Sequence, residues 1–253
     1  MGRRDDLDRF YALLQELALR TGGPRLLSDG NCKDGLPQRG VYFFFEPGEL
    51  RADGKTPRVV RVGTHAVSDG SKTNLWNRLS QHRGRVGGSH AGGGNHRGSI
   101  FRLHVGTALL NRGLASAIPA QHWGSPNRQE DPLQRAAEHR VEQEVSQYIR
   151  TMPFLWLAVD DPPTKHSDRK VIEANAIALL SNYRRVPMDP ASSRWLGCWA
   201  DREAVRNSDL WNVDHVAEEY NPAFLPLLQR YVITTAPIGR TQAAESVVQS
   251  RSK

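Results

Sequence analysis

The sequence predicts an α/β (α+β) fold in which a small, three-stranded, mainly antiparallel sheet is flanked by helices. Two kinds of segment lead to this prediction. Short apolar runs rich in valine and aromatic residues, typical of buried strands, occur at 41–45, 58–63 and 154–159. Apolar residues at helical spacing occur before, between and after these runs. With 253 residues, of which 38% are hydrophobic and 24% charged, the chain is long enough to bury a core.

The N-terminal segment 1–37 is expected to contain a helix over residues 5–21, where apolar residues recur at helical spacing. A loop rich in Gly, Asp and Pro follows it. The first two apolar runs lie on either side of a polar connection that contains Asp53-Gly54, a favourable turn dipeptide. We therefore expect 41–45 and 58–63 to form an antiparallel hairpin.

A helix capped by Ser71 or Thr73 and ending near His82 should follow the hairpin. An insertion of about residues 83–150 comes next. It begins with seven glycines in the fifteen positions 84–98, which predicts a mobile loop. Helical patterns resume within the insertion at 99–112 and 132–152.

The third apolar run, 154–159, does not alternate between apolar and polar residues, so we expect a strand that is buried on both faces. A helix over 168–180 should come after it. The predicted core therefore spans residues 38–185. A helical C-terminal extension is expected over 186–233, and the tail 234–253 is expected to be disordered.

The basic charge of the chain is concentrated in one stretch. The formal net charge is +7, and there is no Asp or Glu from residue 70 to residue 129. Such an acid-free stretch is typical of a polyanion site, with nucleic acid as the first candidate, although a solvated basic surface without a partner would look the same. If DNA binds there, the expected contacts are Lys72, Arg83, Arg85, His96, Arg97 and Arg102.

Five residues could together form a chemical site. Tyr42 and Gly63 lie on predicted strands, Arg78 and His82 are four apart on one helix, and Glu173 lies in an apolar row of the helix 168–180. A carboxylate that faces a core is costly unless a cation meets it, and a divalent ion would suffice. Taken singly, each residue also fits a structural role: a core phenol, a solvated helix face, or a surface ion pair. The combination indicates function.

In this order, the residues resemble the motifs of the GIY-YIG nuclease superfamily. Its first motif appears as Gly40-Val41-Tyr42 and its second as Arg61-Val62-Gly63. The Arg-x-x-x-His helix of its homing and restriction branches appears as Arg78 to His82. The metal-binding glutamate of the family falls on Glu173, and its asparagine falls on Asn182. The resemblance covers about residues 38–185 and implies a GIY-YIG-like fold.

The sequence departs from the family pattern at Arg61, which replaces the tyrosine that opens the second motif. The replacement removes a phenol that family members often place beside the nucleophilic water. Arg61 could add a phosphate contact in its place if the side chain reaches inward. The long connection between the two motifs and the insertion at 83–150 are further departures.

The resemblance implies metal-dependent hydrolysis of phosphodiester bonds. Glu173 would hold a single Mg²⁺ or Mn²⁺ against the scissile phosphate, and Arg78 would stabilise the charge that develops on it. Either Tyr42 or His82 would deprotonate the attacking water. The sequence leaves open which of the two is the base.

We therefore expect a divalent-metal-dependent DNA endonuclease with a role in restriction or another bacterial defence, and with duplex DNA as its partner. One alternative is a nucleic-acid-binding protein whose nuclease centre has decayed, with Arg61 as the first sign. Another is a repair or structure-specific nuclease that acts on single-stranded or branched DNA. The insertion and the C-terminal extension would supply target recognition or the contacts of a homodimer.

Membrane and secreted classes are not expected. The longest apolar runs are too short to cross a bilayer, and the N-terminal segment lacks the apolar stretch of a signal peptide. With two cysteines, Cys32 and Cys198, the chain predicts neither a disulfide framework nor a tetrahedral zinc site. We expect a cytoplasmic protein.

Overall fold

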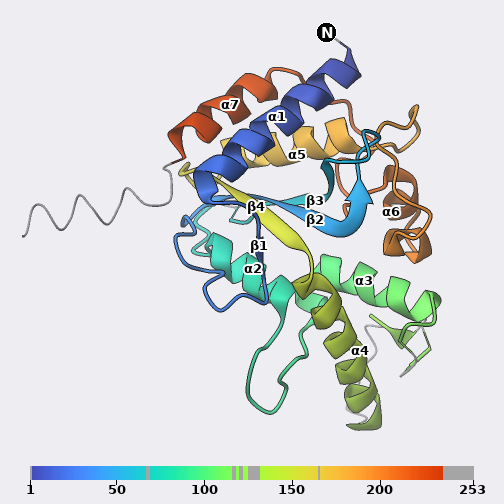
Figure 1. The fold of residues 1–253 in the computed structure, drawn as a ribbon. Helices are drawn as coiled ribbons and strands as arrows, with labels where there is room; N and C mark the ends of the chain where they lie inside the picture. Colours follow the sequence, from blue (N-terminus) through green and yellow to red (C-terminus); the bar gives the residue numbers. More distant parts are fainter. Residues whose placement is uncertain are drawn as a thin grey trace, which may run out of the picture.

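A four-stranded antiparallel sheet lies between two layers of helices (Figure 1). The structure is a computed structural model, and it describes residues 2–66, 69–115, 118–119, 122–124, 132–164 and 166–235. The strand order is β1-β4-β2-β3. The strands span Arg25–Leu26 (β1), Gly40–Leu50 (β2), Pro57–Gly63 (β3) and Pro153–Ala158 (β4).

The three predicted strands and the hairpin of β2 and β3 are confirmed, and β1 is an addition. β1 is two residues long and pairs with β4 at the edge of the sheet, where Arg25 lies opposite Phe154. A strand of this length leaves no periodic signal in the sequence, which explains why the prediction counted three strands.

Each face of the sheet is covered by helices. One layer consists of α1 (Arg3–Thr21), α5 (Asp168–Leu180) and α7 (Phe224–Thr234). The other layer consists of α2 (Leu75–Arg83), α3 (Ile100–Asn111) and α4 (Pro132–Arg150), which lie below the sheet in Figure 1. The predicted helices are confirmed, including both helices of the insertion.

The central strand β2 is apolar without alternation because it contributes to two cores. Val41 and Phe43 belong to the core under α1, α5 and α7. Tyr42 and Phe44 belong to the core under α2, α3 and α4. Since successive side chains of a strand point to opposite faces, a strand between two helix layers must be apolar at nearly every position.

An irregularity in the β2–β3 pairing brings an arginine onto the face of Tyr42. Tyr42 lies opposite Gly63 and Phe44 opposite Arg61, whereas Phe45 lies opposite Val59. The register shift leaves one extra residue in β3, as in a β-bulge. Arg61 therefore lies on the same face as Phe44, and its guanidinium carbon is 4.6 Å from the centre of the Phe101 ring on α3.

The C-terminal extension closes the second core and covers the free edge of β3. It contains a short 3₁₀ helix, Leu196–Trp199, and α6, Glu203–Ser208. The backbone N–H of Trp211 donates to the carbonyl of Val60 at 2.7 Å, and the Asn212 side chain bonds to both backbone groups of Val62. Pairing of this kind protects an exposed strand edge, so the extension is integral to the fold.

Two local predictions need correction. α2 begins at Leu75, and its cap is Asn74 rather than Ser71 or Thr73, because the Asn74 side chain accepts a bond from the Asn77 N–H at 2.8 Å. α7 reaches Thr234, so the predicted tail begins one residue inside a helix, and its remainder after residue 235 lies outside the described residues. Among the described helices, none is long and apolar enough to cross a membrane.

We predict that Gly40→Ala lowers the free energy of unfolding by about 1–3 kcal/mol, as overpacking of a tight site does. A Cβ at Gly40 would lie 2.3 Å from the carbonyl oxygen of Leu157 on β4, so the β2–β4 pairing would have to shift. Urea denaturation measures the change. Gly30→Ala is the control, because a Cβ there meets nothing within 4 Å; equal stability of the two variants would contradict the prediction.

Candidate functional site

The functional candidate is a pocket of about 470 Å³ at the β3 edge of the sheet, where the two helix layers approach each other. Both layers and the C-terminal extension contribute to its wall. The lining residues are Arg61, Arg78, Ile100, His104, Glu173, Ile177, Arg202, Asn212, Val213, Asp214 and His215. The pocket therefore collects residues from five separate segments of the chain.

Tyr42 lies buried beneath this pocket, held between a glycine and a histidine. Its hydroxyl is 2.8 Å from Nε2 of His82. On the neighbouring strand, a Cβ at Gly63 would lie 2.2 Å from the same hydroxyl oxygen. The absence of a side chain at Gly63 therefore allows the close approach of the Tyr42 phenol.

His82 occupies a different position from Arg78, although both lie on α2. The His82 imidazole is fully buried, with Nδ1 2.9 Å from the Ser99 hydroxyl and Nε2 at Tyr42. Burial, together with the positive charges of Arg78 and Arg61, lowers the pKa of His82 well below its ordinary value of 6.5. The imidazole is therefore neutral at pH 7, and it reaches the pocket only through Tyr42.

Arg78 faces the pocket, and its guanidinium donates to the Gln81 side chain at 3.0 Å and to the Gly98 carbonyl at 3.3 Å. Although Arg78 and His82 are four residues apart on α2, they do not both line the pocket. One residue lies in the pocket wall and the other lies in the core behind Tyr42.

Arg61 provides a second guanidinium in the pocket wall. It is 5% exposed, it donates to the carbonyl of Trp211 at 2.6 Å, and its Nε has no hydrogen-bond partner. Burial lowers the pKa of Arg61, while Tyr42 and Glu173 act in the opposite direction. A cation thus stands beside Tyr42 where the family pattern has a second phenol.

Glu173 faces the pocket from α5. Its Oε1 accepts a hydrogen bond from the Thr64 N–H at 3.0 Å, just beyond the end of β3. Burial raises the pKa of Glu173, and Arg61 and the Thr64 bond oppose the rise. Of the two cations one turn earlier on α5, Arg169 and Lys170, Arg169 cannot supply a surface ion pair for Glu173, because it is fully buried and pairs with Asp161.

The donor set at Glu173 fits a single hard divalent cation. Within the described parts of the chain, no group of three or more His, Cys, Asp and Glu residues could hold a metal ion by itself. Mg²⁺ is commonly bound by one or two carboxylates together with waters and substrate phosphates. A carboxylate whose charge is disfavoured by burial would be stabilised by such a cation.

The DNA-contacting residues expected in the insertion divide into two groups. Lys72 and Arg85 are exposed, and Arg83 stacks with its guanidinium carbon 4.6 Å from the centre of the Trp76 ring. Arg83 and Arg85 line a hollow of about 560 Å³, together with other residues of 80–87 and 94–98. Since Gly98 accepts a bond from Arg78, this hollow begins next to the pocket.

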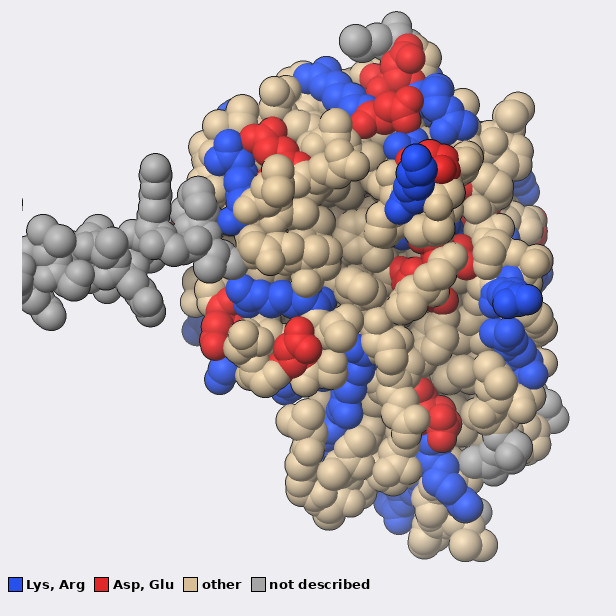
Figure 2. Space-filling view, in the orientation of Figure 1, with Lys and Arg blue, Asp and Glu red and all other residues tan. Residues whose placement is uncertain are grey.

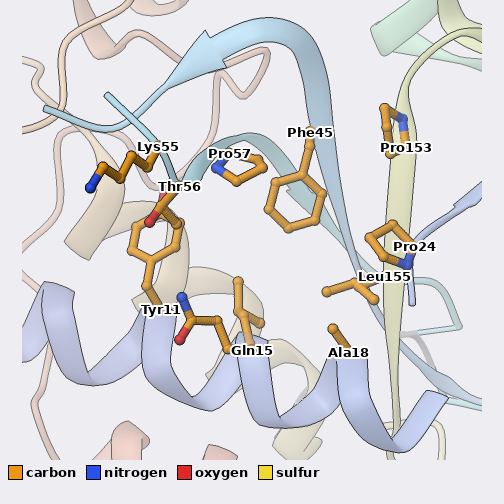
Figure 3. A pocket seen from close by; sticks show the side chains of 11 residues that line it. Tyr11, Gln15, Ala18, Pro24, Phe45, Lys55, Thr56, Pro57, Pro153 and Leu155 are labelled. Atoms are coloured by element: carbon orange, nitrogen blue, oxygen red, sulfur yellow. The ribbon is translucent and has the colours of Figure 1, made fainter. Parts of the chain in front are cut away.

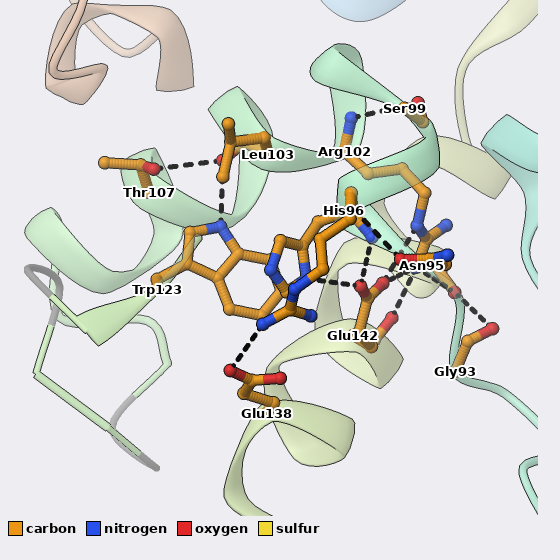
Figure 4. Close-up of polar contacts among 12 residues, drawn as sticks. Gly93, Asn95, His96, Ser99, Arg102, Leu103, Thr107, Trp123, Glu138 and Glu142 are labelled. Atoms are coloured by element: carbon orange, nitrogen blue, oxygen red, sulfur yellow. Dashed lines mark hydrogen bonds and ion pairs between the residues drawn. The ribbon is translucent and has the colours of Figure 1, made fainter. Parts of the chain in front are cut away.

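The other three residues, Arg102, His96 and Arg97, contact acidic side chains of α4 (Figure 4). Arg102 is fully buried and donates through Nε to Glu142 at 2.9 Å, and His96 contacts the same carboxylate through Nδ1 at 2.8 Å. Arg97 donates to Glu138 at 2.8 Å. The expectation that Arg102 and His96 face DNA is therefore wrong, because both are buried and contact Glu142. The sequence did not reveal this contact, because Glu142 lies 40 residues after Arg102, on α4.

The glycine-rich loop also has a packing role. Its residue Arg85 exchanges backbone hydrogen bonds with Gly92 and Gly93, which makes the segment a hairpin-like turn. A Cβ at Gly94 would lie 2.2 Å from the guanidinium carbon of Arg102. Glycine is thus needed here for a close approach to a buried cation as well as for backbone freedom.

A second hollow, of about 360 Å³, lies between α1 and the opposite face of the sheet (Figure 3). Its wall is apolar and includes Tyr11, Phe45, Pro57 and Leu155. It contains no carboxylate, histidine or arginine among its lining residues. The β3-edge pocket therefore remains the candidate for chemistry.

Sequence reasoning missed several residues of the pocket wall. His104, Arg202, Asn212 and His215 line the pocket, and none belongs to a local motif. The asparagine assigned by the resemblance, Asn182, bonds instead to the Met188 N–H and to Asp209, and it is not among the lining residues. The presence of His104 in the basic stretch was the one available signal.

The fold and the pocket together define a nuclease-like α/β domain. A sequence model of the GIY-YIG domain matches residues 1–238, and the chain therefore belongs to the GIY-YIG domain family. The match includes α1 and the C-terminal extension, in agreement with their packing on the sheet. No curated protein and no solved structure matches the chain.

We predict that the protein loses stability as the pH falls below about 6.5. The unfolded chain takes up a proton at His82 near that pH and the folded chain does not, so each such residue lowers the free energy of unfolding by up to about 1.4 kcal/mol per pH unit. Urea denaturation at pH 7.5 and 5.5 measures the loss. His82→Gln should show a smaller loss, and an identical loss in this variant would contradict the assignment.

Proposed function

We propose that the protein is a divalent-metal-dependent DNA endonuclease that hydrolyses phosphodiester bonds at the β3-edge pocket. One observation carries the proposal: a carboxylate, Glu173, and two guanidiniums, Arg61 and Arg78, line a pocket backed by the Tyr42–His82 hydrogen bond. These groups match the needs of the reaction, which are a metal ligand, cations for the phosphate, and a route for the proton of the attacking water.

Tyr42 and His82 act together in this proposal. The Tyr42 oxygen takes a proton from the attacking water while the Tyr42 proton passes to Nε2 of the neutral His82. The hydroxide forms a bond to phosphorus, and the bond from phosphorus to the leaving sugar oxygen breaks. That oxygen takes a proton from solvent. Ser99 holds the other nitrogen of His82 and so fixes the ring that receives the proton.

Arg61 and Arg78 bind and stabilise the phosphate. Their guanidiniums lie in the pocket wall beside Glu173, where charge on the phosphoryl oxygens would develop. When bound by Glu173, Mg²⁺ or Mn²⁺ would supply Lewis acidity at the phosphate. Entry of the phosphate would draw the Arg61 guanidinium away from Tyr42 and give the phenol oxygen access to water.

The DNA follows the hollow next to Arg78. Arg83 and Arg85 line this hollow, and the exposed Lys72 belongs to the same acid-free part of the sequence. On the face seen in Figure 2, acidic and basic side chains lie intermixed. A role in restriction-type defence is our interpretation of the Arg78-to-His82 motif, and duplex DNA is the substrate we would test first.

We predict that Glu173→Ala abolishes cleavage and leaves DNA affinity close to that of the wild type, because Glu173 is assigned to the metal rather than to DNA. Gel assays of cleavage with Mg²⁺ or Mn²⁺, and fluorescence anisotropy for binding, separate the two properties. Near-normal turnover in a folded Glu173→Ala protein would refute the proposed site.

Arg78→Ala should slow the chemical step by on the order of 10²-fold or more, which is the usual cost of removing a transition-state electrostatic contact. Single-turnover kinetics at saturating enzyme measure this step directly. Arg9→Ala is the matched control, since Arg9 lies on α1 and bonds to Gln229. If both variants cleave at the wild-type rate, Arg78 has no role in the reaction.

The double variant Arg83→Gln/Arg85→Gln should bind DNA less tightly and with a weaker dependence on salt. Removing one cation–phosphate interaction flattens the slope of log K against log[salt] by about 0.9 on duplex DNA. Anisotropy titrations at several salt concentrations give the slope. Arg9→Gln/Arg20→Gln on α1 removes the same charge elsewhere, and an equal effect in that variant would show that only net charge matters.

A further inference from the structure

His104 on α3 is a buried histidine that makes no hydrogen bond through its ring. Its side chain is 1% exposed and lines the β3-edge pocket. Neither ring nitrogen has a hydrogen-bond partner. Buried polar groups in folded proteins are nearly always paired, so an unpaired imidazole at a pocket wall calls for a ligand.

The groups around His104 favour an anionic ligand. The nearest carboxylate oxygen, Oδ1 of Asp201, is 3.9 Å from Nδ1, which is close enough to orient the ring but too far for a hydrogen bond. The next residue, Arg202, also lines the pocket, and Arg61 completes the cationic wall. Arg61 and Arg202 line the pocket together with His104, whereas Asp201 is not among the lining residues.

The charge state of His104 is set by the same neighbours. The pKa of His104 is lowered to about 4, mainly by burial; Asp201 opposes the shift, and the positive charges of Arg61 and Arg202 add to it. A phosphate oxygen next to the ring would favour the protonated form and give a charge-assisted hydrogen bond. His104 thus has the properties of a group that binds an anion and is neutral without one.

We propose that His104 and Arg202 form a second phosphate subsite in the pocket, which binds the phosphate of the nucleotide next to the scissile one. The Asp201 carboxylate, with Oδ1 3.9 Å from Nδ1, lies near the imidazole without a hydrogen bond to it. His104 is then a substrate-binding residue rather than part of the Tyr42–His82 proton route. This inference rests on the proposed function, because it takes the polyanion in the pocket to be DNA.

The position of the subsite supports this assignment. The pocket, at about 470 Å³, is in the size range that holds a whole small ligand, which is more than one phosphate group needs. Glu173 and Arg78 come from α5 and α2, whereas His104 and Arg202 come from α3 and the start of α6. The two groups of residues can therefore hold successive phosphates of one strand.

The test variant is His104→Phe, which keeps the ring and removes both nitrogens. Because the nitrogens are unpaired in the free protein, we expect the thermal midpoint to stay the same or to rise. The dissociation constant for a short fluorescein-labelled DNA duplex, measured in EDTA, should rise on the order of 10-fold, as expected when about one charge-assisted hydrogen bond is removed. The Michaelis constant should rise with it, whereas kcat should change little.

Two further variants make the result specific. His104→Gln can still donate a hydrogen bond and should recover part of the affinity. His166→Phe, at an exposed histidine outside the pocket, should behave as the wild type in every assay. Unchanged affinity in His104→Phe would overturn the proposal. The proposal would also be overturned if His104→Phe lowered both the thermal midpoint and the affinity and if His104→Gln did not restore the affinity. That result would indicate that His104 has a structural role.

These experiments distinguish a failure of the proposed phosphate subsite from a failure of the proposed nuclease function. If the wild type binds DNA without cleaving it and His104→Phe weakens binding, the subsite stands and the nuclease proposal fails. If cleavage depends on Glu173 and His104→Phe is silent, the nuclease stands and the subsite fails. If the wild type does not bind DNA, both are overturned.

Discussion

The hydrogen bond between the Tyr42 hydroxyl and the His82 imidazole is the interaction on which the rest of the site depends. It requires that Tyr42 point toward α2 from the central strand, and that the residue opposite it in β3 have no side chain. Gly63 meets this requirement because even a methyl group would overlap the phenol oxygen. The two short motifs of the family are thus parts of one contact across a strand pair, continued through His82 to Ser99 on the insertion.

The arrangement of Tyr42 and His82 also has an electrostatic consequence for the pocket. A neutral imidazole lies beneath the pocket, and three arginines, Arg61, Arg78 and Arg202, line its wall together with Glu173. The Glu173 carboxylate is held by the backbone N–H of Thr64, just beyond the end of β3. Replacing the second phenol by Arg61 therefore adds a cation where a phosphate would enter. On this account Arg61 strengthens phosphate binding and leaves proton transfer to Tyr42 and His82.

The sequence predicted the main elements because their apolar patterns are strong, and α5 begins and ends where its periodicity indicated. Of the site residues it proposed, Arg78 and Glu173 line the β3-edge pocket, and Tyr42 and His82 contact each other in the core. It failed where an answer depends on residues distant in the sequence. Arg102 was expected to be free because no acid lies near it in the chain, yet Glu142 pairs with it across two helices. The wall contributed by the C-terminal extension has no local pattern to reveal it.

Cleavage by the wild-type protein tests the central claim most directly. Supercoiled plasmid and single-stranded circular DNA are incubated with the protein in Mg²⁺, in Mn²⁺ or in EDTA, and the products are separated on a gel. The account predicts nicked or linear products only when a divalent cation is present, since Glu173 is assigned to hold that cation against the phosphate. Tight binding without cleavage of either DNA in any of these solutions would contradict it and would indicate a DNA-binding protein with a decayed centre.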